Sequence, residues 1–261
     1  MRRFSRILFA SFAVFLSGCI STNTNTTSIP PSYPTLTGNW ELSLYALGGY
    51  YGAGAYLTNT NGSVSGSIYI LDSGCYLTAD NQWMPIPVTG TVSTAGVLSL
   101  TSSAVAGQVL SLSGTFTNVN LVEGKYSITG GCANGYEGAA SGYMVLPYSN
   151  TYKGSFEPTD GVGTPFTATI ITTQSGPDAD GFYHVTGTAN FTGNPCMTSG
   201  TITSSTITGM SFDATITNNA GNQINFGGYL TYGSIIGSYE IWGSTCTVSI
   251  GNDLLSVVAE Q

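Results

Sequence analysis

A stretch that ends in cysteine occurs twice in this chain and constrains what the chain can fold into. Val64–Cys75 and Val185–Cys196 keep the same spacing from valine to glycine to cysteine. Farther along, each half has a Gly-x-Tyr-x-Ile segment that leads to another cysteine, over Gly124–Cys132 and Gly237–Cys246. Side chains that alternate with a period of two are typical of a half-buried β-strand. We therefore predict two β-rich units, each with its own cysteine pair.

The composition favours strands over helices. Only 7% of the residues are charged, while 35 are glycine, and serine, threonine and asparagine are abundant. β-Branched and aromatic residues suit a pleated sheet, and glycine and asparagine tolerate turn dihedrals. Turn signals such as Asn61-Gly62 and Asn134-Gly135 separate the strand-like runs. We predict an all-β fold of two tandem antiparallel units, each a small barrel of about eight short strands, with β-sandwiches as the alternative.

The repeat also gives the expected domain boundaries and the buried faces. The first β unit is expected over residues 36–148 and the second over residues 149–261. Alternation places Gly66, Ile68 and Ile70 on the inward face of one strand. The same reasoning gives the other expected inward positions: Tyr126, Ile128, Gly187, Ala189, Phe191, Tyr239 and Ile241.

The first residues have the layout of an export signal. Arg2, Arg3 and Arg6 precede an apolar run over Ile7–Leu16, which is too short to span a bilayer. The motif at the end of this run, Leu16-Ser17-Gly18-Cys19, resembles the lipobox of bacterial lipoproteins. An ordinary signal peptide with an incidental cysteine is the alternative.

The lipobox resemblance implies an address in the cell envelope. Residues 1–18 would be removed as the signal peptide, and the thiol of Cys19 would carry diacylglycerol. Residues 19–35 are polar and contain prolines, so we expect a flexible tether between the lipid and the first β unit. No aspartate follows Cys19, so the retention signal of the inner membrane is absent. We expect a protein anchored by its lipid in the bacterial envelope, at the periplasmic or surface face of the outer membrane.

Four cysteines remain for the β units. An exported chain meets an oxidising compartment, where an even number of cysteines suggests disulfides. The repeat selects one pairing, Cys75 with Cys132 and Cys196 with Cys246. A zinc site made of four thiolates is the alternative, but no C-x-x-C pair is present.

Charge excludes one class of partner. Apart from the three N-terminal arginines, the chain has only Lys125 and Lys153 as cationic residues, against 13 acidic residues. Nucleic-acid binding draws most of its affinity from lysine and arginine contacts to phosphates. We therefore expect no nucleic-acid partner.

The start of each β unit suggests a family. Leu36-Thr37-Gly38-Asn39-Trp40, followed by a hairpin and Asn61–Gly66, resembles the opening of the calycin barrels, the lipocalin and avidin group. The second unit has Gly154-Ser155-Phe156, with phenylalanine in place of tryptophan. The resemblance implies a barrel that this aromatic residue closes at one end. It does not extend to the arginine that commonly packs across the tryptophan in calycins, because neither β unit contains arginine.

Catalytic residue types are scarce. His184 is the only histidine, and no nucleophile motif accompanies it, so we interpret it as a solvent-facing strand residue. Asp178–Gly181 is similar to the start of a calcium loop but lacks the later glutamate, and a hairpin turn is the simpler interpretation. Scattered carboxylates leave open a polysaccharide hydrolase that uses a carboxylate pair. We expect no enzyme activity, no cofactor and no metal.

Tyrosine is the residue type that points to binding. The chain has 16 tyrosines, and Tyr50, Tyr51 and Tyr56 cluster near the first predicted hairpin. Aromatic rings beside glycines stack on sugars or anchor protein partners, and they also serve as packing at barrel ends. We expect a non-enzymatic lipoprotein that binds a small apolar ligand, a glycan or a protein, with a structural or accessory subunit of an envelope assembly as the alternative.

Overall fold

The computed structural model describes residues 32–46, 49–71, 73–159, 163–231, 233–243 and 249–257, the last range as backbone with the exception of Gly251. The predicted signal peptide, Cys19 and Cys246 lie outside the described residues. Both β units belong to one compact unit, Ser32–Gln261.

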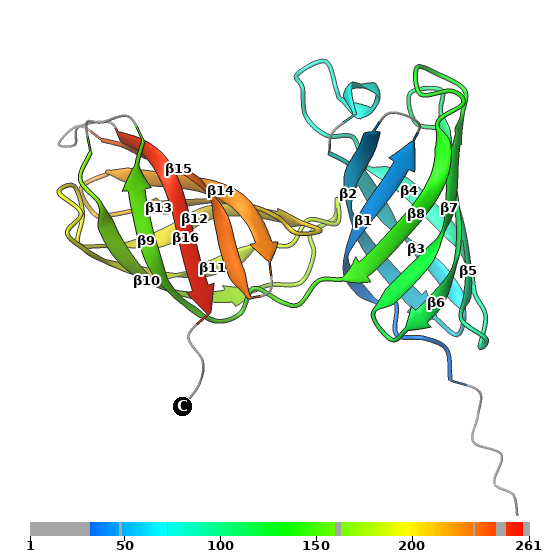
Figure 1. The fold of residues 1–261 in the computed structure, drawn as a ribbon, viewed down its shortest axis with the longest axis horizontal. Helices are drawn as coiled ribbons and strands as arrows, with labels where there is room; N and C mark the ends of the chain where they lie inside the picture. Colours follow the sequence, from blue (N-terminus) through cyan, green and yellow to red (C-terminus); the bar gives the residue numbers. More distant parts are fainter. Residues whose placement is uncertain are drawn as a thin grey trace, which may run out of the picture. The chain divides into compact units, whose positions relative to one another are not determined.

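The first β unit is a closed antiparallel barrel in which each strand pairs with the next along the chain (Figure 1). Pairing of β1 with β8 closes it. A short 3-10 helix, η1 (Gly74–Tyr76), lies between β3 and β4. The strands are β1 (Gly38–Ala46), β2 (Gly49–Thr60), β3 (Ser63–Ile70), β4 (Ile86–Val92), β5 (Val97–Ser102), β6 (Val109–Asn118), β7 (Leu121–Thr129) and β8 (Glu137–Met144).

The second β unit repeats this arrangement, and pairing of β9 with β16 closes it (Figure 1). The all-β prediction of two small barrels is confirmed, and the sandwich alternative is wrong. The strands are β9 (Thr151–Pro158), β10 (Phe166–Gln174), β11 (Val185–Thr192), β12 (Ser199–Thr208), β13 (Ser211–Thr217), β14 (Gln223–Thr231), β15 (Ser234–Trp242) and β16 (Ser249–Val257).

The interiors are filled by apolar side chains. The apolar side chains expected to point inward are buried, with Ile68 at 0% and Ala189 at 1% exposure, whereas Gly66 and Gly187 are half-buried. In the second barrel Phe156 stacks on Phe166 with 4.7 Å between ring centroids. Phe156 also meets Phe191, Phe226 and Tyr239 edge-on, at 5.1–6.5 Å. Edge-to-face contacts of this kind stabilise an aromatic core beyond the area they bury.

The repeated glycines Gly66 and Gly187 are needed because neighbouring strands approach closely. A β-carbon on Gly66 would lie 1.9 Å from the carbonyl oxygen of Tyr56, and one on Gly187 would lie 2.0 Å from that of Ile171. No side chain fits at such distances. The same close approach therefore occurs at the same place in both barrels.

Trp40 closes one end of the first barrel, as the calycin resemblance implies. Its indole nitrogen donates to the carbonyl of Leu36 at 2.8 Å, and its ring meets Phe116 edge-on at 5.9 Å. The ring is 1% exposed. This end of the barrel is thus covered by the segment that leads into β1.

The residue equivalent to Trp40 in the second barrel is Tyr152, not Phe156. Trp40 pairs with Ala55, and Tyr152 pairs with Ile170. The hydroxyl of Thr37, three residues before Trp40, accepts a hydrogen bond from the amide of Asn59, four residues after Ala55. The hydroxyl of Ser149, three residues before Tyr152, likewise accepts from the amide of Gln174, four residues after Ile170. The match of Gly154-Ser155-Phe156 to the calycin motif is therefore wrong by four residues. Phe156 instead fills the centre of its barrel.

At the opposite end of each barrel, a buried amide side chain holds the cysteine loop. In the first barrel Gln108 donates to the carbonyl of Cys75 at 2.9 Å and accepts from the amide of Ala133 at 2.8 Å. In the second, Asn222 donates to the carbonyl of Cys196 at 3.0 Å. Both amide side chains are 1% exposed. We call each of these an amide clip.

The two barrels contact each other through the outer wall of β1 and the β12–β13 turn. Asn39 donates to the carbonyl of Gly209 and accepts from its amide, both at 2.8 Å. Glu41 accepts from the amide of Met210 at 2.8 Å. Gly209 has φ +57, and a β-carbon there would lie 2.1 Å from the carboxylate of Glu41. The turn therefore requires glycine for both its dihedral and its close contact.

A hairpin of the second barrel covers Tyr69 of the first. The hydroxyl of Tyr69 donates to the carbonyl of Asp180 at 2.5 Å, and its ring lies 4.3 Å from the ring of Phe182. Tyr69 alternates with Ile68 and Ile70 and so belongs to the outer face of β3, yet it is 0% exposed. The contact between barrels explains this burial.

Candidate functional site

Five tyrosines gather at the end of the first barrel that lies opposite Trp40. They come from the β1–β2 hairpin, from β7 and from the loop before β8, and we call them the tyrosine rim: Tyr45, Tyr50, Tyr51, Tyr126 and Tyr136. Of the three tyrosines singled out in the sequence, Tyr50 and Tyr51 belong to this rim. Tyr56 does not, because its ring packs on Tyr183 of the second barrel at 5.7 Å.

The outer part of the rim is an exposed pair of rings. Tyr45 and Tyr50 are cross-strand partners on the outer face of the hairpin, with centroids 6.3 Å apart and planes inclined by 36°. They are 48% and 62% exposed. Large aromatic side chains exposed together are typical of binding surfaces, because they offer apolar area at small entropic cost.

The inner part of the rim is more buried. Tyr51 stacks on Tyr136 with 5.6 Å between centroids and 14° between planes. A side-chain hydrogen bond with Tyr136, followed by burial, raises the pKa of Tyr51. Burial, followed by the proximity of Tyr136, raises the pKa of Tyr126. These phenols are therefore neutral at physiological pH.

One hydroxyl of the rim has an unusual environment. The hydroxyl of Tyr126 is buried and has no hydrogen-bond partner among the described residues, and the same is true of Tyr76 in η1 at this end of the barrel. The two side chains are 3% and 1% exposed. Buried hydroxyls are nearly always paired, so an unpaired one calls for water or a ligand as its partner.

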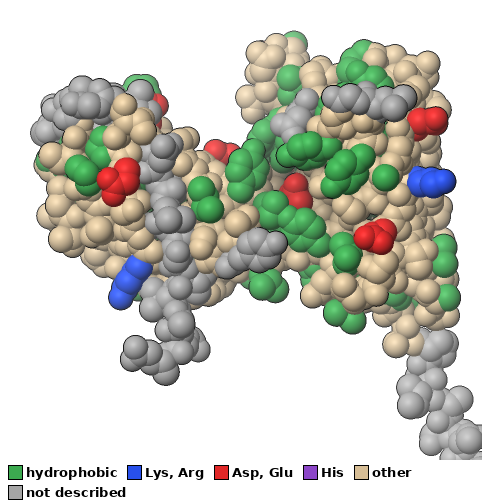
Figure 2. All heavy atoms as spheres, viewed as in Figure 1, with side chains coloured by type: hydrophobic (Ala, Val, Ile, Leu, Met, Phe, Trp, Pro, Cys, Tyr) green, Lys and Arg blue, Asp and Glu red, His purple; other side chains and the backbone are tan. Residues whose placement is uncertain are grey.

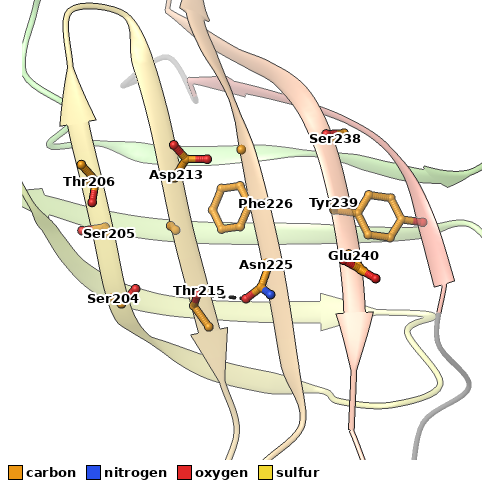
Figure 3. Close-up of a pocket in the computed structure, with 12 residues that line it drawn as sticks. Ser204, Ser205, Thr206, Asp213, Thr215, Asn225, Phe226, Ser238, Tyr239 and Glu240 are labelled. Carbon is orange, nitrogen blue, oxygen red and sulfur yellow. Dashed lines mark hydrogen bonds between the residues drawn. The ribbon is translucent and has the colours of Figure 1, made fainter. Parts of the chain in front are cut away.

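A polar hollow lies on the outer wall of the second barrel and has a volume of about 360 Å³. Figure 3 shows Asp213, Asn225 and Glu240 on the neighbouring strands β13, β14 and β15. The hydroxyl of Thr215 donates to the side-chain oxygen of Asn225 at 2.9 Å. Burial raises the pKa of Asp213. The hollow therefore offers carboxylate and amide groups but no cation.

The first barrel has an equivalent hollow of about 360 Å³. Leu112 and Tyr126 are cross-strand partners in the wall of the first barrel. Phe226 and Tyr239 are cross-strand partners at the corresponding place in the second barrel, so the two hollows lie on equivalent strands. Serine and threonine hydroxyls line most of this hollow, together with the oppositely charged Lys125 and Glu137. Charged side chains are also sparse on the face seen in Figure 2. The repeat thus preserves the place of the hollow and not its chemistry.

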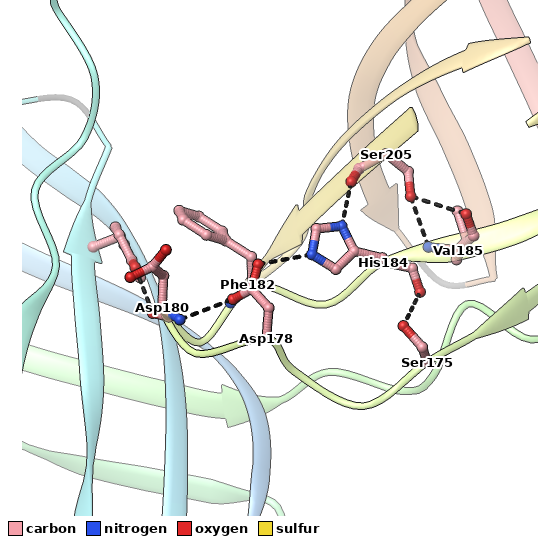
Figure 4. A network of polar contacts seen from close by, with 8 residues as sticks. Ser175, Asp178, Asp180, Phe182, His184, Val185 and Ser205 are labelled. Carbon is pink, nitrogen blue, oxygen red and sulfur yellow. Dashed lines mark hydrogen bonds and ion pairs between the residues drawn. The ribbon is translucent and has the colours of Figure 1, made fainter. Parts of the chain in front are cut away.

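His184 does not have the surroundings of a catalytic base. Its Nδ1 lies 2.5 Å from the carbonyl oxygen of Ser205, and its Nε2 lies 2.8 Å from a carboxylate oxygen of Asp178 (Figure 4). The hydroxyl of Ser205 bonds instead to the amide and carbonyl of Val185. Histidine, serine and aspartate are therefore close together, but the histidine faces the serine carbonyl and not its hydroxyl. The interpretation of His184 as solvent-facing is only partly right, since the side chain is 40% exposed.

Asp178 organises a hairpin turn. Its other carboxylate oxygen accepts from the amides of Asp180 and Phe182, both at 3.0 Å (Figure 4). This is an Asx-type turn, as the proline, aspartate and glycine pattern suggests. Among the described residues, no group of three or more histidine, cysteine, aspartate or glutamate side chains is placed to hold a metal ion.

Cys75 and Cys132 form a disulfide bond. Cys196 is also disulfide-bonded. Its predicted partner, Cys246, lies outside the described residues, so that pairing stays a prediction, as does lipidation of Cys19. Within the described ranges, no helix is long and apolar enough to cross a membrane.

No protein-family model matches the chain, and no curated protein matches it. Two crystal structures resemble it distantly. One is a candidate outer membrane protein from Bacteroides fragilis, with 12% identity and a TM-score of 0.28 over 85% of this chain and 97% of that one. The other is a protein of unknown function of the DUF3598 family from Nostoc punctiforme, with 11% identity and a TM-score of 0.21 over 85% of this chain and 96% of that one. Neither likeness is strong enough to carry an argument.

Proposed function

We propose that the protein is a lipid-anchored envelope protein without catalytic activity, and that its first barrel binds a ligand through the tyrosine rim. The signal-like start of the chain and the lipobox around Cys19 support the anchor. The disulfide between Cys75 and Cys132 supports an exported protein, because such bonds persist in oxidising compartments.

The observation that carries the binding role is the tyrosine rim itself. An exposed aromatic pair, Tyr45 with Tyr50, lies on the outer face of the β1–β2 hairpin. Tyr51 and Tyr136 stack at the same end of the barrel, on the inner side of its wall. Large aromatic side chains that are exposed together and held by strand pairing are typical of a binding surface.

Catalysis has less support. Both ring nitrogens of His184 are engaged, which leaves neither for a substrate. Asp213 and Glu240 rise from the same face of one sheet, two strand intervals apart, which is about 10 Å before the offset along the strands is added. Carboxylates that cleave a glycosidic bond flank it from two sides at about 5–10 Å. The hydrolase alternative is thus less favoured than binding.

The experiment is photo-crosslinking in intact cells. Tyr50 is replaced by p-benzoylphenylalanine in the full-length protein, and Tyr229, which is 57% exposed on the second barrel, is replaced in the same way as the control. We expect an irradiation-dependent adduct from position 50 and none from position 229. A protein adduct would favour the accessory-subunit form of the proposal. No adduct at position 50, or the same adduct at both positions, would refute a binding role for the rim.

The anchor is tested separately. Mature protein should gain the mass of a diacylglycerol adduct at Cys19 and fractionate with outer membranes. The Cys19→Ser variant should leave the membrane fraction. Unmodified Cys19 in membrane-bound protein would contradict the lipoprotein assignment.

A further inference from the structure

We infer that the first barrel rests on the membrane surface with the end at which the chain enters it, and so presents the tyrosine rim away from the membrane. We call this surface the entry end. It is made of the segment 32–37 and of the β2–β3, β4–β5 and β6–β7 turns, at 61–62, 93–96 and 119–120. The inference rests on the proposed function, because the proposed lipid on Cys19 is what brings this end to the bilayer.

The entry end is a continuous surface, because its turns are tied to one another. The ring of Tyr33 lies over Gly62, where an added β-carbon would meet it at 2.4 Å. The carbonyl of Gly62 accepts from the amide of Val92 at 2.8 Å. The carbonyl of Gly96 accepts from the amide of Phe116 at 2.9 Å, close to the β6–β7 turn. The described chain therefore enters the barrel through a surface that is already ordered (Figure 1).

Three apolar side chains of this surface are exposed to solvent. Val119 occupies the tip of the β6–β7 turn and is 74% exposed. The side chain of Asn118 accepts from the amide of Asn120 at 2.9 Å and fixes that turn. Val97, which follows the β4–β5 turn, and Tyr33 are 53% and 39% exposed. Exposed apolar side chains gathered on one surface mark contact with a partner or a membrane, and tyrosine is enriched at membrane–water interfaces.

The entry end carries no charged side chain. Its residues, all of them described, are serine, threonine, asparagine, glycine, proline and apolar residues. The opposite end of the barrel carries Asp80 and Glu137. Anionic lipids repel carboxylates, and the chain has 13 acidic residues against five basic ones. The end without carboxylates is thus the one that approaches an anionic bilayer with the least repulsion.

The place where the chain enters selects the membrane as the partner of this surface. Residues 19–31 lead from the proposed lipid to the entry end. As a coil, a predicted tether of this length would reach about 20 Å. The nine residues of β1 rise about 30 Å, which is about 23 Å along the axis of a tilted barrel. The tether therefore holds the entry end close to the bilayer, whereas the rim could reach it only if the tether also ran the height of the barrel.

The test measures the environment of single positions in the membrane-bound protein. Full-length lipidated protein is placed in nanodiscs of phosphatidylethanolamine and phosphatidylglycerol that contain a nitroxide-labelled phospholipid. Dansylalanine replaces Val119 at the entry end, or Tyr50 or Asp80 at the opposite end, all of which are exposed. We expect a blue shift and strong nitroxide quenching at position 119, because interfacial side chains enter a bilayer by about 5–10 Å. Quenching at positions 50 and 80 should be several-fold weaker.

Val97→Asp tests whether the apolar side chains make the contact. This change should weaken nitroxide quenching of the label at position 119 several-fold, because it removes an apolar contact and places a carboxylate against anionic headgroups. The matched control is Thr101→Asp, which adds the same charge to the exposed face of the same strand at its opposite end. It should leave the quenching unchanged. Equal quenching in the two variants would overturn the role given to the apolar side chains.

The outcomes separate this inference from the proposed function. In protein whose lipid is confirmed by mass spectrometry, equal quenching at positions 119 and 50, or stronger quenching at position 50, would overturn the inference and leave the anchor intact. A blue shift at position 119 without quenching would mean that a protein, such as a second copy of the chain, covers the entry end, and would overturn the inference as well. Protein without lipid on Cys19 would refute the anchor and the inference together.

Discussion

The pKa of His184 is expected to lie above its ordinary value, because the folded structure favours the charged form of the ring. Its two ring nitrogens face only acceptors, the carbonyl oxygen of Ser205 at 2.5 Å and the carboxylate of Asp178 at 2.8 Å. A neutral imidazole has one N–H group and can satisfy one of these acceptors, whereas an imidazolium satisfies both. The hydrogen bond to Asp178, followed by that to Ser205, therefore raises the pKa of His184 above its ordinary value of 6.5.

The contribution to stability is modest, and its sign follows from the direction of the pKa shifts. The side chains of His184 and Asp178 are 40% and 38% exposed, so solvent screens their attraction. Pairs of this kind contribute about 0.2–1 kcal/mol. Because the folded-state pKa of His184 is raised, its share is complete below about pH 6.5 and is lost as the pH rises through the folded-state pKa.

Asp178 sets the acidic limit of this contribution. Partial burial disfavours its ionised form, but hydrogen bonds from His184 and from the amides of Phe182 and Asp180 outweigh it and lower the pKa of Asp178 below 3.8. Its contribution is therefore present above that value and is lost as the pH falls through the folded-state pKa. The full contribution of the pair is expected between about pH 4 and pH 6.5.

The assay uses the fact that His184 is the only histidine of the chain. In protein labelled with ¹⁵N-histidine the ring should titrate above pH 6.5, with both ring nitrogens protonated on the acidic side of that titration. Asp178→Asn should lower the pKa of His184. Asp180→Asn removes a charge from the same hairpin without touching the ring, and should leave the pKa unchanged. Titration at or below pH 6.5 would refute the reasoning.

Three further predictions concern stability and are measured by denaturant unfolding. Replacing both Cys75 and Cys132 by serine should cost about 4 kcal/mol, from the entropy of a loop whose ends are 57 residues apart; a loss below about 1 kcal/mol would contradict the entropic account. Gln108→Leu should cost about 2–3 kcal/mol, because the half-buried carbonyl of Cys75 and the buried amide of Ala133 both lose their bonds, whereas an unchanged midpoint would show that the amide clip is dispensable. Asn39→Ala should cost about 2–4 kcal/mol by leaving the amide and carbonyl of Gly209 unpaired, and Asn39→Asp should cost no less, because a carboxylate cannot donate to that carbonyl.

Local patterns predict the strands well because a barrel wall is built from alternation. Ile68 and Ile70 are assigned inward from their spacing alone, and the repeat alone suggests the bond between Cys75 and Cys132. A period of two, however, cannot detect a shift by an even number of residues. For this reason the sequence pattern matched Trp40 to Phe156, which lies four residues after the true equivalent, Tyr152.

The candidate site depends on contacts that no local pattern contains. Tyr50 and Tyr51 could be singled out because they are adjacent in the chain. Tyr136 could not, because it meets Tyr51 only once the barrel has closed. Tyr126 is assigned to the core by its spacing, and the sequence gives no sign that its hydroxyl lacks a partner. The identity of the rim is therefore a product of tertiary structure.

The hydrogen bonds between Asn39 and Gly209 join the two barrels, so they affect what happens when one barrel is produced without the other. A first barrel produced alone would open the outer wall of β1 and β3 to water, and Tyr69, now 0% exposed, would become a surface ring. Its partners in the second barrel, Asp180 and Phe182, would lose their contacts as well. The second barrel therefore covers part of the outer surface of the first, so the two repeats are not equivalent modules.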